Sequence, residues 1–471
     1  MKAKGLFLIL ILVGLIRAWW VFTSEVSPQD AYYWMCSQRL SGAFFDGPAG
    51  TALLLRAFGD DLAAARLFWV VMGFLASWAA WLFLRRIADE RIAAWAVILL
   101  NAIPAFHFSS IEVGPLMPAL LLSLSGLVLA RVAWEGKRTA WLGSGLLFAA
   151  AVCFRYEAIL IPLGLLGAAA ASRRHRSDGP WLVGILLLCA AALWPAMAWN
   201  ASLEWIPVAG GTLRSAWEFH PTRILGGVER LALDFSPPVL LLIAGGLVLL
   251  LRRAQMHARA AFLAAVSVPL WVLCALFVYS GSAPLSAAWL GFVPVAGFAT
   301  ASVIGSRPGR WAISLCILLA VAFSWVGMRR HGWEAVAREA LLAARDLPAA
   351  EQAGFFIADE PELAAVLGYH MPHSPGPPAV FVPESPALVN QFGIWASYAD
   401  FVDSPVVLNE YFTEQRGVNP YVGRNAVYIG SELPQTISAA FSEVVPLKTI
   451  AEPDGRTLGI YLCIGYETLP L

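Results

Sequence analysis

Eleven apolar stretches of membrane-spanning length occupy most of the first 328 residues of this chain. A bilayer core needs about 20 apolar residues to be crossed by a helix, and only a helix or a closed barrel satisfies its own backbone there. The sequence therefore predicts an α-helical polytopic membrane protein. The expected spans are residues 5–22, 62–84, 90–106, 112–133, 139–154, 157–171, 180–198, 237–251, 260–279, 285–305 and 309–328.

The composition agrees with this class and excludes others. Hydrophobic residues make up 59% and charged residues 14% of the 471 residues, far from the average of a soluble domain. The 32 basic residues equal the 32 acidic ones, so the chain lacks the positive charge with which nucleic-acid binders gather phosphates. Nucleic acid is not an expected partner. The six cysteines form no CxxC pair and have no His at metal spacing, which indicates packing residues.

The basic residues predict the orientation, because Lys and Arg near span ends stay in the cytoplasm. They gather in alternate loops, on the same side as Lys2 and Lys4: Arg85, Arg86 and Arg91; Arg131, Lys137 and Arg138; Arg173, Arg174 and Arg176; Arg252, Arg253 and Arg259; Arg307 and Arg310. We expect a cytoplasmic N-terminus and, after an odd number of spans, an extracytoplasmic C-terminus. One miscounted span near Arg155 would reverse the tail.

The pattern changes after Arg330 to short apolar runs separated by Pro, Gly and charge. We predict two domains: residues 1–330, with a long first outer loop at 24–61, and an α/β domain at 331–471 with a partly parallel sheet. Strands are expected at 354–358, 379–382, 425–429 and 457–462, and helices at 361–367 and 434–441.

The first outer loop combines carboxylates with aromatic residues, which favour the headgroup region of a membrane. Asp30 and Asp46 each precede a short amphipathic segment. At a helix N-terminus the macrodipole favours the ionised carboxylate, so either residue is a candidate general base. The same positions suit simple helix caps equally well.

Two motifs of this loop, Gln29-Asp30-Ala31-Tyr32-Tyr33-Trp34 and Phe45-Asp46-Gly47-Pro48, resemble the first outer loop of the GT-C glycosyltransferases that use polyprenyl-phosphate sugars. This group includes protein O-mannosyltransferases and the aminoarabinose transferase of lipid A. Further similar motifs are Phe154-Arg155-Tyr156-Glu157-Ala158 and Trp194 to Asn200. The resemblance implies an inner-membrane transferase with a lipid-linked sugar donor and a glycan, lipid or protein acceptor.

Three positions depart from the family pattern. Gln29 stands where many members have Asp, Gly47 stands where they have His, and Leu116 stands where they have a second acid. Glu112 precedes Leu116 by four residues and would share its face if both lay on one helix. A member that keeps the fold and the lipid but has lost transferase activity therefore stays an alternative.

The implied chemistry needs one base and one cation. The leaving phosphate requires positive charge rather than an acid, whereas the acceptor must lose a proton to a carboxylate, and one displacement implies inversion. The resemblance points to Asp30 as base, then Asp46, then Glu112. Arg155 interrupts an apolar stretch and is the first candidate for the phosphate, unless it pairs with Glu157 or snorkels to the headgroups.

The second long outer loop, at 200–234, adds cations and aromatic rings that suit phosphate and sugar. Further phosphate candidates are Arg223 and Arg230, and substrate-binding candidates are Tyr33, Trp34, Tyr156 and His220. No cofactor or metal is demanded. A transporter or flippase is the rival class, but the charges gather at span ends rather than at the bilayer midplane.

Overall fold

The computed structural model describes residues 3–206, 221–254, 257–280, 286–327, 332–345, 353–370, 380–383, 390–395, 397–398, 421–451 and 457–467. The chain divides into two compact units. The membrane unit comprises residues 1–24 and 39–328, and the sheet unit comprises residues 25–38 and 329–471.

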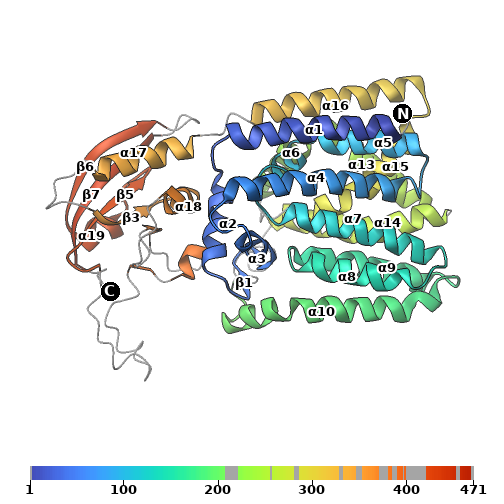
Figure 1. Cartoon of the computed structure of the whole chain (residues 1–471), viewed down its shortest axis with the longest axis horizontal. Coiled ribbons are helices and arrows are strands. Elements are labelled where there is room, and N and C mark those ends of the chain that lie inside the picture. The colour runs from blue at the N-terminus through green and yellow to red at the C-terminus, as the bar shows by residue number, and fades with distance from the viewer. Residues whose placement is uncertain are drawn as a thin grey trace. The chain divides into compact units, whose positions relative to one another are not determined.

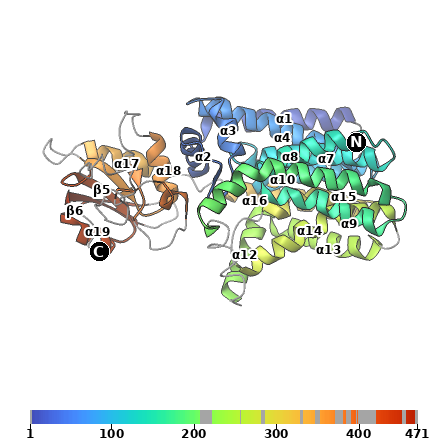
Figure 2. The same cartoon turned by 90° about the horizontal axis from the view of Figure 1, so that it is seen from below.

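Helices lying side by side, most of them long, build the membrane unit (Figures 1 and 2). They are α1 (Ala3–Thr23), α4 (Leu62–Leu84), α5 (Glu90–Ala102), α6 (Pro104–Ser109), α7 (Leu116–Trp134), α8 (Ala140–Val152), α9 (Leu160–Ala171), α10 (Gly179–Ser202), α12 (Pro221–Phe235), α13 (Pro237–Ala254), α14 (Ala258–Ser280), α15 (Ser286–Val303) and α16 (Arg307–Gly327). Short elements between them are β1 (Ala43–Phe44), β2 (Gly47–Pro48), α3 (Gly50–Arg56) and the 3₁₀ turns η1 (Tyr156–Ile159) and η2 (Arg176–Asp178).

Each predicted span contains a helix, and the polytopic helical fold is confirmed. In the described part of the chain, six segments are long and apolar enough to cross a membrane: α1, α4, α7, α10 with the turn before it, α13 and α14. The helix predicted over 90–106 breaks at Ile103, which is extended before Pro104 starts α6. Whether all eleven segments cross the bilayer stays a prediction.

The outward face of α1 shows what surrounds this unit. Leu8, Leu15 and Phe22 are 66%, 63% and 68% exposed. A soluble protein rarely exposes large apolar side chains in a continuous row, whereas lipid tails solvate them. This exposed row is therefore suited to face lipid.

The sheet unit contains five strands in the order β4-β3-β5-β7-β6. The strands are β3 (Ala353–Ala358), β4 (Val380–Phe381), β5 (Asn425–Gly430), β6 (Phe441–Ala451) and β7 (Thr457–Tyr466). β3 pairs in parallel with β4 and β5, while β7 is antiparallel to β5 and β6. The partly parallel sheet is thus confirmed. The helices of this unit are α2 (Pro28–Gln38), α17 (Trp333–Arg345), α18 (Pro361–His370) and α19 (Gln435–Ala440).

Strand β6 is the element of the sheet that the sequence did not predict. It lies at the sheet edge, and its ladder shifts register between Pro446 and Lys448. Proline and charged residues are typical of edge strands, where they discourage pairing with other chains. The same residues interrupt the apolar run by which a buried strand is predicted.

Helix α2 groups with the sheet unit, although the sequence placed all of 24–61 in the membrane domain. The rings of Trp34 and Tyr369 meet edge to face at 5.3 Å, and Met35 lies against Gly368 of α18. Tyr33 and Trp34 are 5% and 6% exposed. The expectation that these aromatic residues lie in the membrane interface is wrong, since α2 buries them within the protein.

Candidate functional site

Asp46 occupies the turn of a small hairpin in the membrane unit. β1 and β2 pair through Ala43 with Pro48 and Phe44 with Gly47, which leaves Phe45 and Asp46 at the turn. The paired strand residues Ala43, Phe44, Gly47 and Pro48 are buried, whereas Asp46 is exposed. Asp46 does not cap the next helix, because the N-cap of α3 is Ala49, without a side-chain hydrogen bond. The predicted helix-terminal position of this carboxylate is therefore wrong.

Two glycines that flank this hairpin bring it close to the end of α8 and to α10. The Gly50 N–H donates to the Cys153 carbonyl at 3.0 Å, and a Cβ on Gly50 would lie 2.4 Å from that oxygen. A Cβ on Gly42 would lie 2.7 Å from the Pro195 carbonyl of α10. Only glycine permits such close approach, so the hairpin is fixed at the point where α8 gives way to η1.

Residues from three elements gather at this point, and we call Asp46, Arg155, Tyr156, Glu157 and Asn200 the hairpin cluster. The Asn200 side chain donates to the Tyr156 hydroxyl at 3.3 Å and to the Ala196 carbonyl at 2.8 Å. Tyr156 interacts electrostatically with Asp46 and Glu157. The loop motif and the Arg-Tyr motif, far apart in sequence, thus meet in space.

Arg155 brings the positive charge to this cluster. Its backbone is extended, with φ −145° and ψ 122°, and this ends α8 and starts η1. Its side chain is half-buried, and within the described part of the chain its buried Nε has no hydrogen-bond partner. A half-buried guanidinium with an unpartnered N–H, adjacent in sequence to Tyr156, suits an oxyanion ligand.

Asp30 lies in the first turn of α2, in the sheet unit. Its Oδ2 accepts from the Ser27 N–H at 3.1 Å, and its own N–H donates to the Ser27 hydroxyl at 3.1 Å. These reciprocal bonds form a capping box, and the carboxylate is fully buried. The helix-terminal position predicted for Asp30 is confirmed, and capping is an observed role of one of its oxygens.

The remaining predicted residues are less closely grouped. Glu112 lies in the loop before α7, which begins at Leu116, so the expected shared helical face does not exist. Gly114 and Pro115 keep that loop out of the helix. Arg223 and Arg230 belong to helix α12 rather than to an open loop, and Arg230 is exposed. His220 lies outside the described residues.

Two buried arginines are not among the residues that the sequence analysis singled out. Arg17 of α1 is 2% exposed and donates to the Asn101 side chain at 3.0 Å. Arg66 of α4 is 4% exposed and donates to the carbonyls of Ile111 and Val21 at 3.1 and 3.2 Å. A lone arginine inside an apolar run is the signal that the sequence offers for both. Among the described residues no group of three His, Cys, Asp or Glu could hold a metal ion.

Comparison with known proteins gives a family match and a fold. The family model for dolichyl-phosphate-mannose-protein mannosyltransferase matches residues 48–199. The apo crystal structure of ArnT from Cupriavidus metallidurans superposes with a TM-score of 0.61 at 13% identity, covering 98% of each chain. The oligosaccharyltransferase of Archaeoglobus fulgidus, solved with Zn and sulfate, superposes with a TM-score of 0.53 at 12% identity, covering 99% of this chain and 74% of that one. No curated protein sequence matches. The chain has the GT-C fold, and the resemblance drawn from its motifs is confirmed.

Proposed function

We propose that this chain, which has the GT-C fold, is a membrane glycosyltransferase that moves a sugar from a polyprenyl-phosphate donor to an acceptor. The observation that carries the proposal is the family match over residues 48–199. That segment contains Arg155, Tyr156 and Glu157 and ends one residue before Asn200. The hairpin cluster therefore lies largely within the part of the chain that the family match covers.

The hairpin cluster is our candidate for the donor phosphate. As the bond between the sugar and the phosphate breaks, the phosphate oxygens gain negative charge, which a guanidinium held in place stabilises. Arg155 supplies the cation, and its spare Nε–H can donate to an oxygen. Tyr156 adds a hydroxyl that Asn200 positions. Arg223 and Arg230 of α12 are further candidates for the phosphate.

A carboxylate must take the proton of the attacking hydroxyl or amine. The motif resemblance assigns this role to Asp30, and we propose Asp30 as the base with Asp46 as the second candidate. Direct displacement by the acceptor inverts the configuration of the anomeric carbon. Tyr33, Trp34 and His220 are proposed to contact the sugar or the acceptor. Glu112 is a third candidate for the base, although its loop position removes the helical argument for it.

The location follows from the distribution of basic residues and from the donor. We propose an inner-membrane protein with its N-terminus in the cytoplasm and residues 331–471 outside. The polyprenyl tail would lie along the exposed apolar helix faces, whose side chains are suited to contact with lipid. The sheet unit is proposed to recognise the acceptor, which is a glycan, a lipid or a protein.

Two experiments test this function against its rivals. Proteoliposomes that contain the full chain and fluorescent undecaprenyl-phosphate mannose, supplied with a membrane extract as the source of acceptor, distinguish transfer from transport. Cleavage of the sugar from the lipid supports the proposal, whereas movement of intact lipid across the bilayer supports a flippase. In parallel, Arg155→Ala should abolish transfer. Arg155→Lys should retain part of it, because the ammonium of lysine keeps the positive charge but not the planar set of N–H donors that binds two phosphate oxygens at once. If the wild type and both variants bind donor lipid but none of the three cleaves it, the chain keeps the fold and the lipid binding without transferase activity.

A further inference from the structure

A second charged cluster lies at the other end of the membrane unit, away from the hairpin cluster. It forms where α4 ends, where α7 ends and where α14 begins. We call Arg86, Arg131, Arg174 and Arg259 the arginine cluster. The charge of Arg131 interacts with those of Arg86, Arg174 and Arg259 and with that of Glu135. The four cations come from four different segments of the chain, so the fold gathers them.

Positive charge exceeds negative charge in this cluster. Glu135 is its carboxylate, at 3.2 Å from Arg131 Nε and 3.6 Å from Arg86. Four guanidinium groups against this one carboxylate leave three positive charges. Like charges repel, and bringing them together costs free energy unless an anion joins them. The arginine cluster therefore has the electrostatics of an anion site.

Aromatic rings hold the central member of the cluster in place. The Arg131 guanidinium lies over the Phe262 ring of α14 at 5.5 Å from its centroid. Phe262 meets Trp134 edge to face at 5.3 Å. Arg259 donates to the Ile87 carbonyl at 3.3 Å, which directs it toward the loop after α4. Part of the cost of ordering these long side chains is thus met before any ligand binds.

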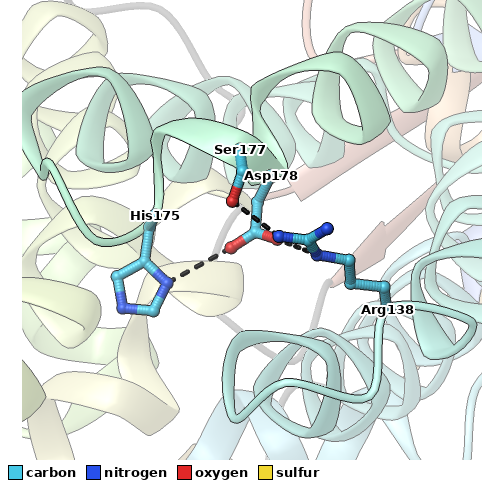
Figure 3. A network of polar contacts seen from close by, with 4 residues as sticks. All are labelled: Arg138, His175, Ser177 and Asp178. Carbon is cyan, nitrogen blue, oxygen red and sulfur yellow. Dashed lines mark hydrogen bonds and ion pairs between the residues drawn. The ribbon is translucent and has the colours of Figure 1, made fainter.

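A polar network fixes the loop that carries Arg174 (Figure 3). Asp178 lies between an imidazole and a guanidinium: its Oδ2 is 3.2 Å from His175 Nδ1, and its Oδ1 is 3.8 Å from Arg138 Nε. Arg138 also donates to the Ser177 hydroxyl at 2.7 Å. The His175 ring stacks on Trp134 at 4.2 Å. The 172–178 loop is therefore tied to α7 and to the loop before α8, and it holds Arg174 near the cluster.

We propose that the arginine cluster binds the phosphate of an anionic phospholipid headgroup. The cluster lies at the ends of apolar helices, at the level where lipid headgroups lie. Basic sites between transmembrane helices are suited to anionic headgroups, and guanidinium forks match phosphate oxygens in geometry. The exposed side chains of Arg174 and Arg259 leave the cluster accessible from that side. This site is independent of the proposed transferase activity.

Native mass spectrometry of the purified full chain tests this proposal by counting bound lipids. Phosphatidylglycerol and phosphatidylcholine are titrated separately, and inorganic phosphate is the soluble control. We expect saturable binding of phosphatidylglycerol at least tenfold tighter than that of phosphatidylcholine. Arg174→Gln and Arg259→Gln, at exposed positions where folding is least affected, should each weaken it several-fold. The double variant should remove the preference.

The matched control is Arg307→Gln, an exposed arginine at the start of α16 outside the cluster. It should leave the preference unchanged. Equal affinity for the two lipids, or equal loss in Arg307→Gln, would show that loop arginines act only in membrane orientation and would overturn the proposal. Competition by millimolar inorganic phosphate with no lipid preference would assign the site to a soluble anion instead, which also overturns it.

Discussion

The capping box of α2 allows the two possible roles of Asp30 to be separated by magnitude. Ser27 and Asp30 exchange two hydrogen bonds of 3.1 Å each. Asp30→Asn removes the charge but keeps an oxygen that can accept from the Ser27 N–H. If capping is the whole role, the variant loses less than about 1 kcal/mol of stability and keeps its activity. If Asp30 is the base, transfer falls by about 10²–10⁴-fold.

Ser27→Ala is the matched control, because it breaks the same capping box and leaves the carboxylate. It removes the hydroxyl that accepts from the Asp30 N–H, at a cost of about 0.5–2 kcal/mol. The two variants should therefore differ in opposite ways. Ser27→Ala should lower the unfolding temperature more than Asp30→Asn does, and Asp30→Asn should lower the transfer rate more than Ser27→Ala does.

The assay follows the transfer of sugar from undecaprenyl-phosphate mannose to acceptor in a membrane extract by each purified variant, with thermal unfolding measured on the same variants. We expect Asp30→Asn to lose at least about 100-fold in rate, or about 2.7 kcal/mol in barrier. Ser27→Ala should stay within about threefold of the wild type, since its carboxylate is intact. A folded Asp30→Asn protein that transfers sugar at the wild-type rate would refute the assignment of Asp30 as base.

Further predictions concern the hairpin cluster and the packing around it. Asp46→Asn should slow transfer measurably but less than Asp30→Asn; the reverse order of rates would exchange the two roles. Gly50→Ala should cost about 1–3 kcal/mol, because its Cβ would lie 2.4 Å from the Cys153 carbonyl, whereas Gly14→Ala, with open space around its Cβ, should not lower the unfolding temperature. In the sheet unit, burial raises the pKa of Cys463 to about 12, so the thiol stays protonated at pH 8. Maleimide should therefore label Cys463, located by peptide mass spectrometry, only after denaturation; rapid labelling of the folded protein would contradict this.

Sequence reasoning worked where one physical signal dominates. A helix in lipid needs a long apolar run, and such runs located the apolar helices of the membrane unit to within a few residues, whereas the amphipathic helix α12 was predicted as a loop. The strands β3 and β5 were equally visible, because burial on both faces makes a strand apolar throughout, and β7 was visible from its run of apolar residues. Strand β6, at the sheet edge with Pro446 and Lys448, carries no such signal.

The candidate site was harder to predict because its residues are gathered by the tertiary fold. Nothing local indicates that Asp46 comes near Tyr156 or that α2 packs on α18 rather than in the membrane interface. The helical argument for Glu112 failed because Gly114 and Pro115 stop the helix before it reaches that residue. Family resemblance identified the motifs, and the structure was needed to group Asp46 with Arg155 and to show Asp30 in its cap.

The central claim is that a sugar leaves polyprenyl phosphate on this protein. It is tested most directly with the full chain in nanodiscs, supplied with undecaprenyl-phosphate sugars labelled in the sugar and with a membrane extract as the source of acceptor. A nanodisc has no second compartment, so transport gives no signal there. The account predicts that label leaves the donor lipid for the acceptor fraction while an equal amount of undecaprenyl phosphate appears, and that Arg155→Ala stops both. Donor that stays intact with every sugar tested, from a folded protein that binds it, would contradict the account.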